Sequence, residues 1–182
     1  MRRATAKKSE PTPVTAEEKD IMHVLHKEHM LVSNLFFEFS QAKTNKQKKE
    51  LVTKIIDELT AHAEVEQKVV YSALRKDGDD VEDIMDEADT EHHVIELLIG
   101  ELSKMEPKDD YYDAKVTVLC EVVKHHVDEE EKEIFEKLED SDLDAEELAQ
   151  KYLEAKAAFK QKRPLRLVKS APTARRTAGK RR

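Results

Sequence analysis

Four long segments of this chain repeat apolar residues every three or four positions, the spacing that places them on one face of an α-helix. The segments run from about residue 15 to 43, 44 to 76, 79 to 106 and 109 to 138, with short turns between them. Long amphipathic helices joined by short turns pack as antiparallel neighbours, because each must bury its apolar face. We therefore predict an all-α protein built as an antiparallel up-down-up-down four-helix bundle.

The turns hold residues that cap or interrupt helices, namely Thr15 with Glu18 in a capping box, Thr44 or Asn45, Gly78, Asp79 or Asp80, and Pro107. A further segment, 145–162, has the composition of a shorter fifth helix. We divide the chain into a basic disordered arm (1–14), the four-helix bundle (15–140), an extra C-terminal helix (141–162) and a basic disordered tail (163–182).

The net charge of −8 conceals an uneven distribution along the chain. Residues 156–182 carry eleven basic residues and no acidic one, whereas residues 14–155 carry 39 acidic residues against 17 basic ones. The last segment lacks apolar periodicity, which is typical of disorder. We expect a flexible solubilising tail. Weak electrostatic contact with nucleic acid or with an anionic membrane surface is the alternative.

The number of cysteines and the hydropathy of the chain indicate in which cellular compartment the protein is expected. The single Cys120 excludes an internal disulfide framework and fits a reducing cytosol. No stretch approaches the ~18 consecutive apolar residues of a membrane span. The basic start "MRRATAKKSEPTP" is followed by no apolar segment, so it does not resemble a secretory signal. We expect a cytoplasmic protein without a membrane span.

Polar residues of a particular kind interrupt each apolar face. Every segment carries one histidine there, near its middle, so the four meet at one level of an antiparallel bundle. Glu66 and Glu130 each follow such a histidine by four residues, one turn further along the same face. The histidines are His29, His62, His92 and His126.

Two glutamates inside an apolar bundle point to a bound cation. An ionised carboxylate in such surroundings costs several kcal/mol unless it is paired or binds a cation. A pair of metal ions about 3.5–4 Å apart and bridged by carboxylates would offset that cost. Imidazole and carboxylate without thiolate suit iron, manganese, zinc or copper. The pattern therefore predicts a transition-metal site with coordination positions open to a small oxygen species.

The order of these residues resembles the hemerythrin family in its bacterial HHE cation-binding form. The resemblance rests on His29 and on "HAEVE", "EHHVIELL" and "HVDEEEKEIF", and it covers about residues 20–140. It implies a non-haem di-iron centre, oxo- or hydroxo-bridged. The ligands it implies are His29, His62, Glu66, His92, His126 and Glu130. Ferritin-like di-iron bundles use Glu-x-x-His instead, which this chain lacks.

One position departs from the oxygen carriers of that family. They place a second histidine four residues after the one on the third helix, where this chain has Glu96. The resemblance thus implies a protein that binds or senses dioxygen, peroxide or nitric oxide rather than a five-histidine carrier. An enzyme that removes hydrogen peroxide or nitric oxide at the same site is one alternative. A metal-free helical adaptor with a nucleic-acid-binding tail is another.

Several neighbours of the predicted ligands remain alternatives. A one-residue rotation of a helix would bring in His93, His125 or Glu131 instead. His26 lies on the same side of its helix as His29 but off the apolar face. Glu96 is interpreted as a surface residue, with an extra ligand or a hydrogen-bond acceptor for an imidazole N–H as the alternatives. Tyr71 is interpreted as a packing residue at the end of the bundle, with a redox or hydrogen-bonding role as the alternative.

Overall fold

The structure, a computed structural model, describes residues 20–78 and 81–162. The predicted arm and tail, the capping box at Thr15 and the capping aspartates at 79–80 lie outside the described residues. Among the residues that are described, no helix combines the length and apolar character that crossing a membrane requires.

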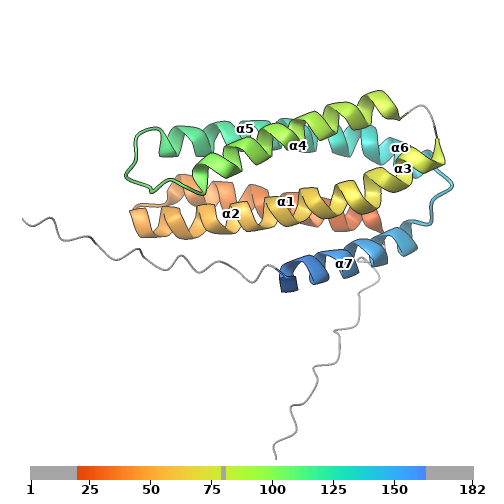
Figure 1. Cartoon of the computed structure of the whole chain (residues 1–182), viewed down its shortest axis with the longest axis horizontal. Helices are drawn as coiled ribbons and strands as arrows, with labels where there is room; N and C mark the ends of the chain where they lie inside the picture. The colour runs from red at the N-terminus through yellow and green to blue at the C-terminus, as the bar shows by residue number, and fades with distance from the viewer. Residues whose placement is uncertain (1–19, 79–80, 163–182) are drawn as a thin grey trace, which may run out of the picture.

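Four helical rods and one shorter helix make up the described part of the chain (Figure 1). The rods are α1 (Ile21–Gln41); α2 (Asn45–Glu66) continued by the π-helix η2 (Gln67–Tyr71) and α3 (Ser72–Asp77); α4 (Glu82–Leu102); and α5 (Tyr112–Glu129) continued by the π-helix η3 (Glu130–Ile134) and α6 (Phe135–Asp140). The shorter helix is α7 (Ala145–Lys162).

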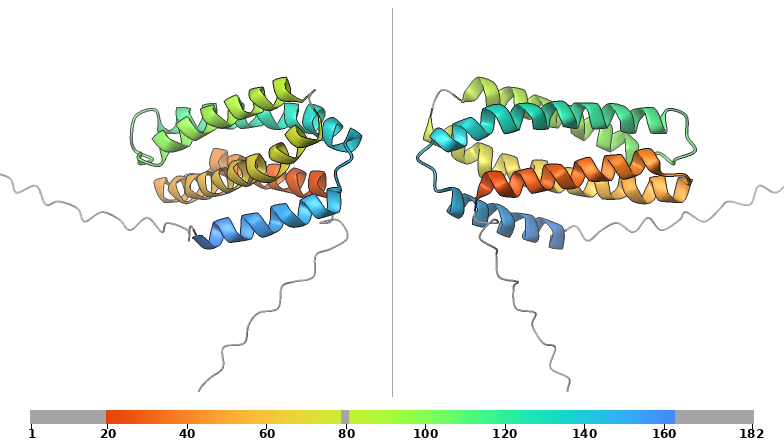
Figure 2. Two further views of the ribbon diagram at one scale, coloured as in Figure 1. Left: turned by 45° about the vertical axis from the view of Figure 1, so that its right-hand side comes forward. Right: turned by 180° about the vertical axis from the view of Figure 1, so that it is seen from behind.

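Successive rods run antiparallel and pack as two pairs. Helix α1 packs against α2, and α4 packs against α5, while α7 lies along the outside of α1 and α2 (Figures 1 and 2). The predicted up-down-up-down bundle with a fifth helix is therefore confirmed. In Figure 2 the fifth helix stays beside the first two rods in both views.

Side-chain caps decide where the first two rods begin. The carboxylate of Asp20 accepts a hydrogen bond from the backbone N–H of Met22 at 2.8 Å and so caps α1, which begins at Ile21. Of the two candidate caps of the second rod, Thr44 is the one used. Its hydroxyl accepts from the N–H of Gln47, whose side chain accepts from the N–H of Thr44 in return.

Tyr111 begins the fourth rod in a strained conformation. Its φ is 67°, in the left-handed region, where an L-residue with a Cβ costs about 1–2 kcal/mol. The side chain is 77% exposed, so packing recovers little of that cost. We expect Tyr111→Gly to raise the free energy of unfolding by about 0.5–1 kcal/mol, since glycine's larger chain entropy offsets part of the gain. Urea denaturation measures this, and a loss of stability in the variant would contradict it.

Two hydrophobic clusters fill the bundle on either side of its midpoint. One includes Leu25 and Met85, and the other includes Val32 and Leu119. On α1 the boundary between them falls at His29, which lies between Leu25 and Val32. The predicted polar layer therefore separates two apolar cores, each of which anchors all four rods.

The two π-helices lie where the buried glutamates are. The N–H of Ser72 donates to the carbonyl of Gln67, and the N–H of Phe135 donates to that of Glu130, in each case five residues back. Such a turn takes in one more residue than an α-helical turn and is frequent at functional sites. The π-turns rotate the remainder of each rod relative to an uninterrupted helix.

This rotation makes part of the predicted apolar face wrong. The spacing of Leu59, His62 and Glu66, continued without interruption, predicts Val69 and Ala73 on the buried face of the second rod. Both are only half-buried. The buried residues after Glu66 are Val70, Tyr71 and Leu74. Tyr71 is thereby brought to the middle of the bundle rather than to its end.

Candidate metal centre

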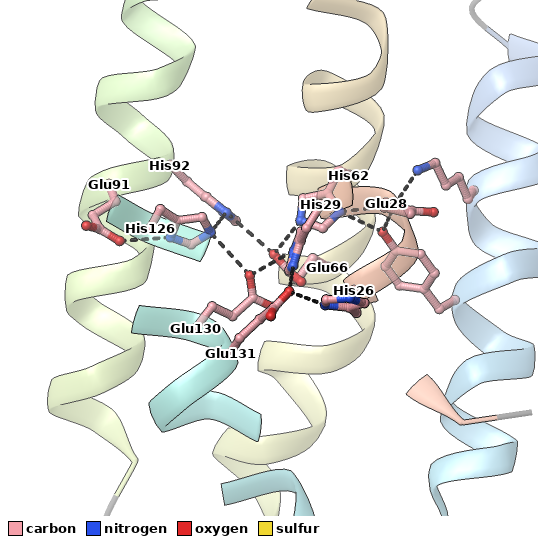
Figure 3. Close-up of polar contacts among 12 residues, drawn as sticks. His26, Glu28, His29, His62, Glu66, Glu91, His92, His126, Glu130 and Glu131 are labelled. Atoms are coloured by element: carbon pink, nitrogen blue, oxygen red, sulfur yellow. Dashed lines mark hydrogen bonds and ion pairs between the residues drawn. The ribbon is translucent and has the colours of Figure 1, made fainter. Parts of the chain in front are cut away.

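The six predicted ligand residues meet in one layer at the middle of the bundle (Figure 3). They come from all four rods, and none is more than 6% exposed. They are His29 on α1, His62 and Glu66 on α2, His92 on α4, His126 on α5 and Glu130 at the start of η3. The sequence pattern predicted that these six side chains would meet, and they do. Their role as metal ligands stays a prediction.

Each carboxylate lies between imidazoles of two different rods. One carboxylate oxygen approaches a ring nitrogen on either side, at 3.3 and 3.5 Å. The contacts are Glu66 Oε2 with the Nε2 atoms of His62 and His92, and Glu130 Oε2 with those of His29 and His126.

The layer divides into two overlapping groups that could each hold a cation. One is His29, His62, Glu66 and Glu130, and the other is Glu66, His92 and His126. Within each group the potential ligand atoms lie within 4.8 Å of one another. Because Glu66 belongs to both groups, the geometry offers two adjacent cation positions that share a carboxylate.

The donor atoms of this layer fit a transition-metal ion. Six of them are buried and lack a hydrogen-bond partner among the described residues: Nε2 of His29 and His62, and both carboxylate oxygens of Glu66 and Glu130. Unpaired buried polar atoms are rare in proteins and each calls for an explanation. A cation bound to imidazole and carboxylate donors, with no thiolate among them, accounts for all six.

The two carboxylates differ in charge in the absence of a cation. Burial and the negative charge of Glu66 raise the pKa of Glu130 well above its ordinary value. Burial alone would raise the pKa of Glu66 as well, but the positive charge of His62 holds it well below its usual range. Against burial, Glu66 and a hydrogen bond to Glu28 raise the pKa of His62 to about 10. A metal ion binding here must therefore displace the second proton of the His62 imidazole and compete with protonation of Glu130.

Three of the four imidazoles are held by a further carboxylate at Nδ1, the nitrogen that points away from the centre. The pairs are His29 with Glu131 at 2.8 Å, His62 with Glu28 at 3.0 Å and His126 with Glu91 at 2.8 Å. Such contacts fix the orientation of a ring and raise its basicity as a ligand. Each leaves Nε2 directed at the centre, as Figure 3 shows.

Helical periodicity does not identify these outer carboxylates. Glu131, the alternative to Glu130 in the sequence, hydrogen-bonds to His29 instead. Glu28 and Glu91 are not among the residues that the sequence pattern predicts. The available signal was sequence adjacency, since each outer carboxylate is the immediate neighbour of a predicted ligand.

Tyr71 supports the fourth imidazole in a different way. Its ring stacks on that of His92, with centroids 5.6 Å apart and planes 14° from parallel. Burial and the charge of Glu66 raise the pKa of the Tyr71 phenol well above its usual value, so the hydroxyl keeps its proton beside the centre. Burial and the charge of His126 lower the pKa of His92 to about 3, which leaves that ring neutral, as a metal ligand must be.

Helix α7 reaches the centre through Glu28. The hydroxyl of Tyr152 donates to Glu28 Oε2 at 2.7 Å, and the ammonium group of Lys156 forms an ion pair with the same oxygen. Burial opposes ionisation of Glu28, but His62 and Lys156 lower its pKa to about 2. Tyr152 is 0% and Lys156 8% exposed. The fifth helix is thus part of the environment of the second rod's histidine, a connection that the sequence pattern did not indicate.

The remaining candidates lie at the edge of the centre or away from it. His26 contacts Glu131 at 2.9 Å and so joins the layer only indirectly. Glu96 and His93 are exposed on α4 and belong to neither buried group. His125 lies on the surface, 3.5 Å from Glu91 and 3.3 Å from Glu129.

A small cavity of about 20 Å³ borders the four histidines. That volume admits a molecule of about the size of water. Apart from the histidines and Glu28, its lining is apolar: Val32, Leu59, Ala63, Ile95, Val123 and Val127. The cavity therefore offers an apolar space directly beside the candidate ligands.

Comparison with known proteins supports both the fold and the class of site. The family model "Hemerythrin HHE cation binding domain" matches residues 20–138, which leaves α7 outside the match. The crystal structure of an HHE cation binding domain-containing protein from Mycobacterium kansasii superposes with a TM-score of 0.67 at 21% identity, over 81% of this chain and 94% of that one. At this identity the likeness concerns the fold.

The chain is also similar in sequence to part of a larger protein of a different description. A DNA nickase from Nostoc sp. is 29% identical over 145 residues, which is 78% of this chain. The match covers 40% of the nickase, so this chain spans about two fifths of that protein's length.

Proposed function

Because this chain belongs to the hemerythrin HHE cation-binding domain family, we propose that its buried layer holds a non-haem di-iron centre that binds or senses dioxygen, peroxide or nitric oxide. The family supports a bound cation, and the shared Glu66 supports two adjacent ions. Bound iron would supply reversible coordination of such molecules and one-electron exchange with them. The ligands would be His29, His62, Glu66, His92, His126 and Glu130.

The apolar cavity beside the histidines is the observation that carries this proposal. A charged or strongly polar substrate would lose its hydration on entering a space with this lining, at a cost of several kcal/mol. A neutral molecule of two heavy atoms has little hydration to lose. Size and polarity together favour dioxygen or nitric oxide over larger substrates.

The chain's own residues would prepare that site. Val32, Leu59, Ile95 and Val123 exclude bulk water from the cavity, which strengthens electrostatic interactions inside it. The outer carboxylates hold three rings in place. Tyr71 keeps a phenolic proton next to Glu66 and Glu130.

This retained proton favours the enzymatic alternative, removal of hydrogen peroxide or nitric oxide at the same centre. Disproportionation of two hydrogen peroxide molecules to two waters and dioxygen moves two protons from one peroxide to the other, and a phenol beside the centre could relay them. Sustained oxygen evolution from hydrogen peroxide by the iron-loaded protein, reduced at least about tenfold in Tyr71→Phe, would support an enzyme. Binding without turnover would support a carrier or sensor.

The similarity to a DNA nickase raises DNA as a partner of this chain. Direct strand cleavage at the centre is not supported, since its residues are at most 6% exposed and the cavity holds about 20 Å³. Contact with DNA would fall to the basic residues of 163–182, outside the described residues. Plasmid nicking and salt-dependent retardation of DNA by the full chain, with and without iron, check this alternative. We expect no nicking.

Iron reconstitution tests the main proposal. The chelator-treated protein, supplied with ferrous iron without oxygen and then exposed to oxygen, is expected to hold about two irons per chain and to show oxo-to-iron absorption bands. His62→Ala should lose at least one iron and the bands, whereas the exposed His93→Ala should keep both. Metal analysis that finds no bound iron in the wild type would refute the proposal.

A further inference from the structure

We infer that Glu91, His125 and Glu129 form a second cation site, on the surface, and that divalent ions pass from it along an acidic groove into the buried centre. The surface site is argued from its own geometry. The passage into the centre rests on the proposed function.

The three side chains already have the spacing of a cation site. His125 Nε2 lies 3.5 Å from Glu91 Oε1 and 3.3 Å from Glu129 Oε1. One potential ligand atom from each residue lies within 4.8 Å of the other two. An imidazole with two carboxylates suits a divalent transition-metal ion. The His125 side chain is 64% exposed, so an ion can reach it directly from solvent.

A groove leads inward from this cluster between α4 and the fourth rod. Its acidic lining consists of Glu87, Glu91, Glu129, Glu130 and Glu133, and no lysine or arginine is among its lining residues. The nearby Lys132 pairs with Glu133 at 2.9 Å. A cleft lined by charges of one sign concentrates counter-ions and raises their rate of association.

The inner end of the groove reaches an unpaired carboxylate of the buried centre. Glu130 lines it, is 1% exposed and has no hydrogen-bond partner on either carboxylate oxygen among the described residues. His126 lines it as well. The groove therefore runs from the surface cluster to two of the candidate ligands of the buried centre.

Glu91 connects the two ends. One of its oxygens accepts from Nδ1 of His126 at 2.8 Å, and the other faces His125 at 3.5 Å (Figure 3 shows the inner contact). An ion held at the surface would thus lie one carboxylate away from a buried ligand.

The apolar cavity beside the centre suits small neutral molecules rather than cations. The cavity on the other side of the polar layer has one carboxylate, Glu28, in its lining, whereas the groove has five, and its remaining lining apart from the histidines is apolar. A hydrated dication is therefore attracted less strongly to the cavity than to the groove. Cations would therefore enter through the acidic groove, and small neutral molecules would occupy the apolar cavity.

The test uses the double variant His125→Ala/Glu129→Gln of the full chain. The matched control is His93→Ala/Glu96→Gln, which removes the same residue types from an exposed face of α4 outside the groove. Titration with Mn²⁺, followed by electron paramagnetic resonance of the free ion, counts bound ions. Stopped-flow mixing of chelator-treated protein with ferrous iron, followed by ultraviolet absorption, measures the rate of uptake.

We expect the His125/Glu129 variant to bind about one Mn²⁺ fewer per chain than the control and the wild type. We also expect it to take up iron about tenfold more slowly at low salt but to the same final content, with the difference shrinking as salt rises. An unchanged Mn²⁺ count overturns the surface site. A lowered Mn²⁺ count with unchanged uptake overturns its role in delivery. Failure of the wild type to hold iron refutes the proposed function, and the Mn²⁺ count still decides the surface site.

Discussion

Exchanging Glu66 for glutamine is expected to abolish iron loading and to destabilise the protein even when no metal is present. In the metal-free chain this carboxylate is ionised and lies 3.3 Å from the charged imidazole of His62. Both groups are buried, and removal of one partner of such a pair costs about 3–5 kcal/mol. We expect a loss near the lower end of that range, because Glu28 still pairs with Nδ1 of His62. For a domain of this size that loss lowers the melting temperature by roughly 10 °C.

Glu130→Gln should behave differently in the same assay, although it removes the same atom type from the same layer. Burial and the charge of Glu66 raise the pKa of Glu130 well above its usual value and so favour its neutral, protonated form. Glutamine matches the neutral carboxyl group in size, so the metal-free variant should stay within about 1 kcal/mol of the wild type.

In the presence of metal, Glu66→Gln and Glu130→Gln should lose a similar amount of stabilisation. A ligand present at 1,000 times its dissociation constant stabilises the folded state by about 4 kcal/mol. Both variants should lose most of that gain, because each lacks one carboxylate ligand of the centre. Differential scanning calorimetry with chelator and with anaerobic ferrous iron measures all four values. A metal-free Glu130→Gln that melts below metal-free Glu66→Gln would contradict the assigned charges.

The bundle and its polar layer were predictable because both follow from one regularity. A histidine and a glutamate spaced by four residues on an apolar face must point into the core wherever the helix is uniform. The prediction therefore held for His62 with Glu66 and for His126 with Glu130, which all lie before a π-turn or at its first residue. It was wrong beyond that point on the second rod, since no propensity in "QKVVY" marks a π-turn.

The outer carboxylates were not predictable for a geometric reason. Glu28, Glu91 and Glu131 each lie about 100° away from the apolar face of their own helix. Each reaches a histidine of another rod, and so its role depends on how neighbouring helices are rotated about their axes. Helical periodicity describes one helix at a time and contains no information on that rotation.

The fifth helix gives the second large prediction. Lys156→Met is expected to lower the free energy of unfolding by about 3 kcal/mol and to weaken iron binding about 10–100-fold. Lys156 is 8% exposed and pairs with Glu28, which in turn holds Nδ1 of His62 at 3.0 Å. Without the ammonium group the buried carboxylate loses a positive partner, its pKa rises, and its hold on the imidazole weakens. Urea denaturation and competition with a coloured chelator measure the two effects.

A control on the same helix and a second substitution separate charge pairing from packing. Lys151 is 60% exposed and pairs with Glu147 within one turn, so Lys151→Met should change neither stability nor iron affinity appreciably. Combining Lys156→Met with Glu28→Gln should cost less stability than the sum of the single changes, because the double variant leaves no unpaired charge. Strictly additive losses would mean that Lys156 acts through its methylene chain alone. Because α7 lies outside the residues that the family model matches, a coupling here would show that a helix added to the domain takes part in holding a ligand of the centre.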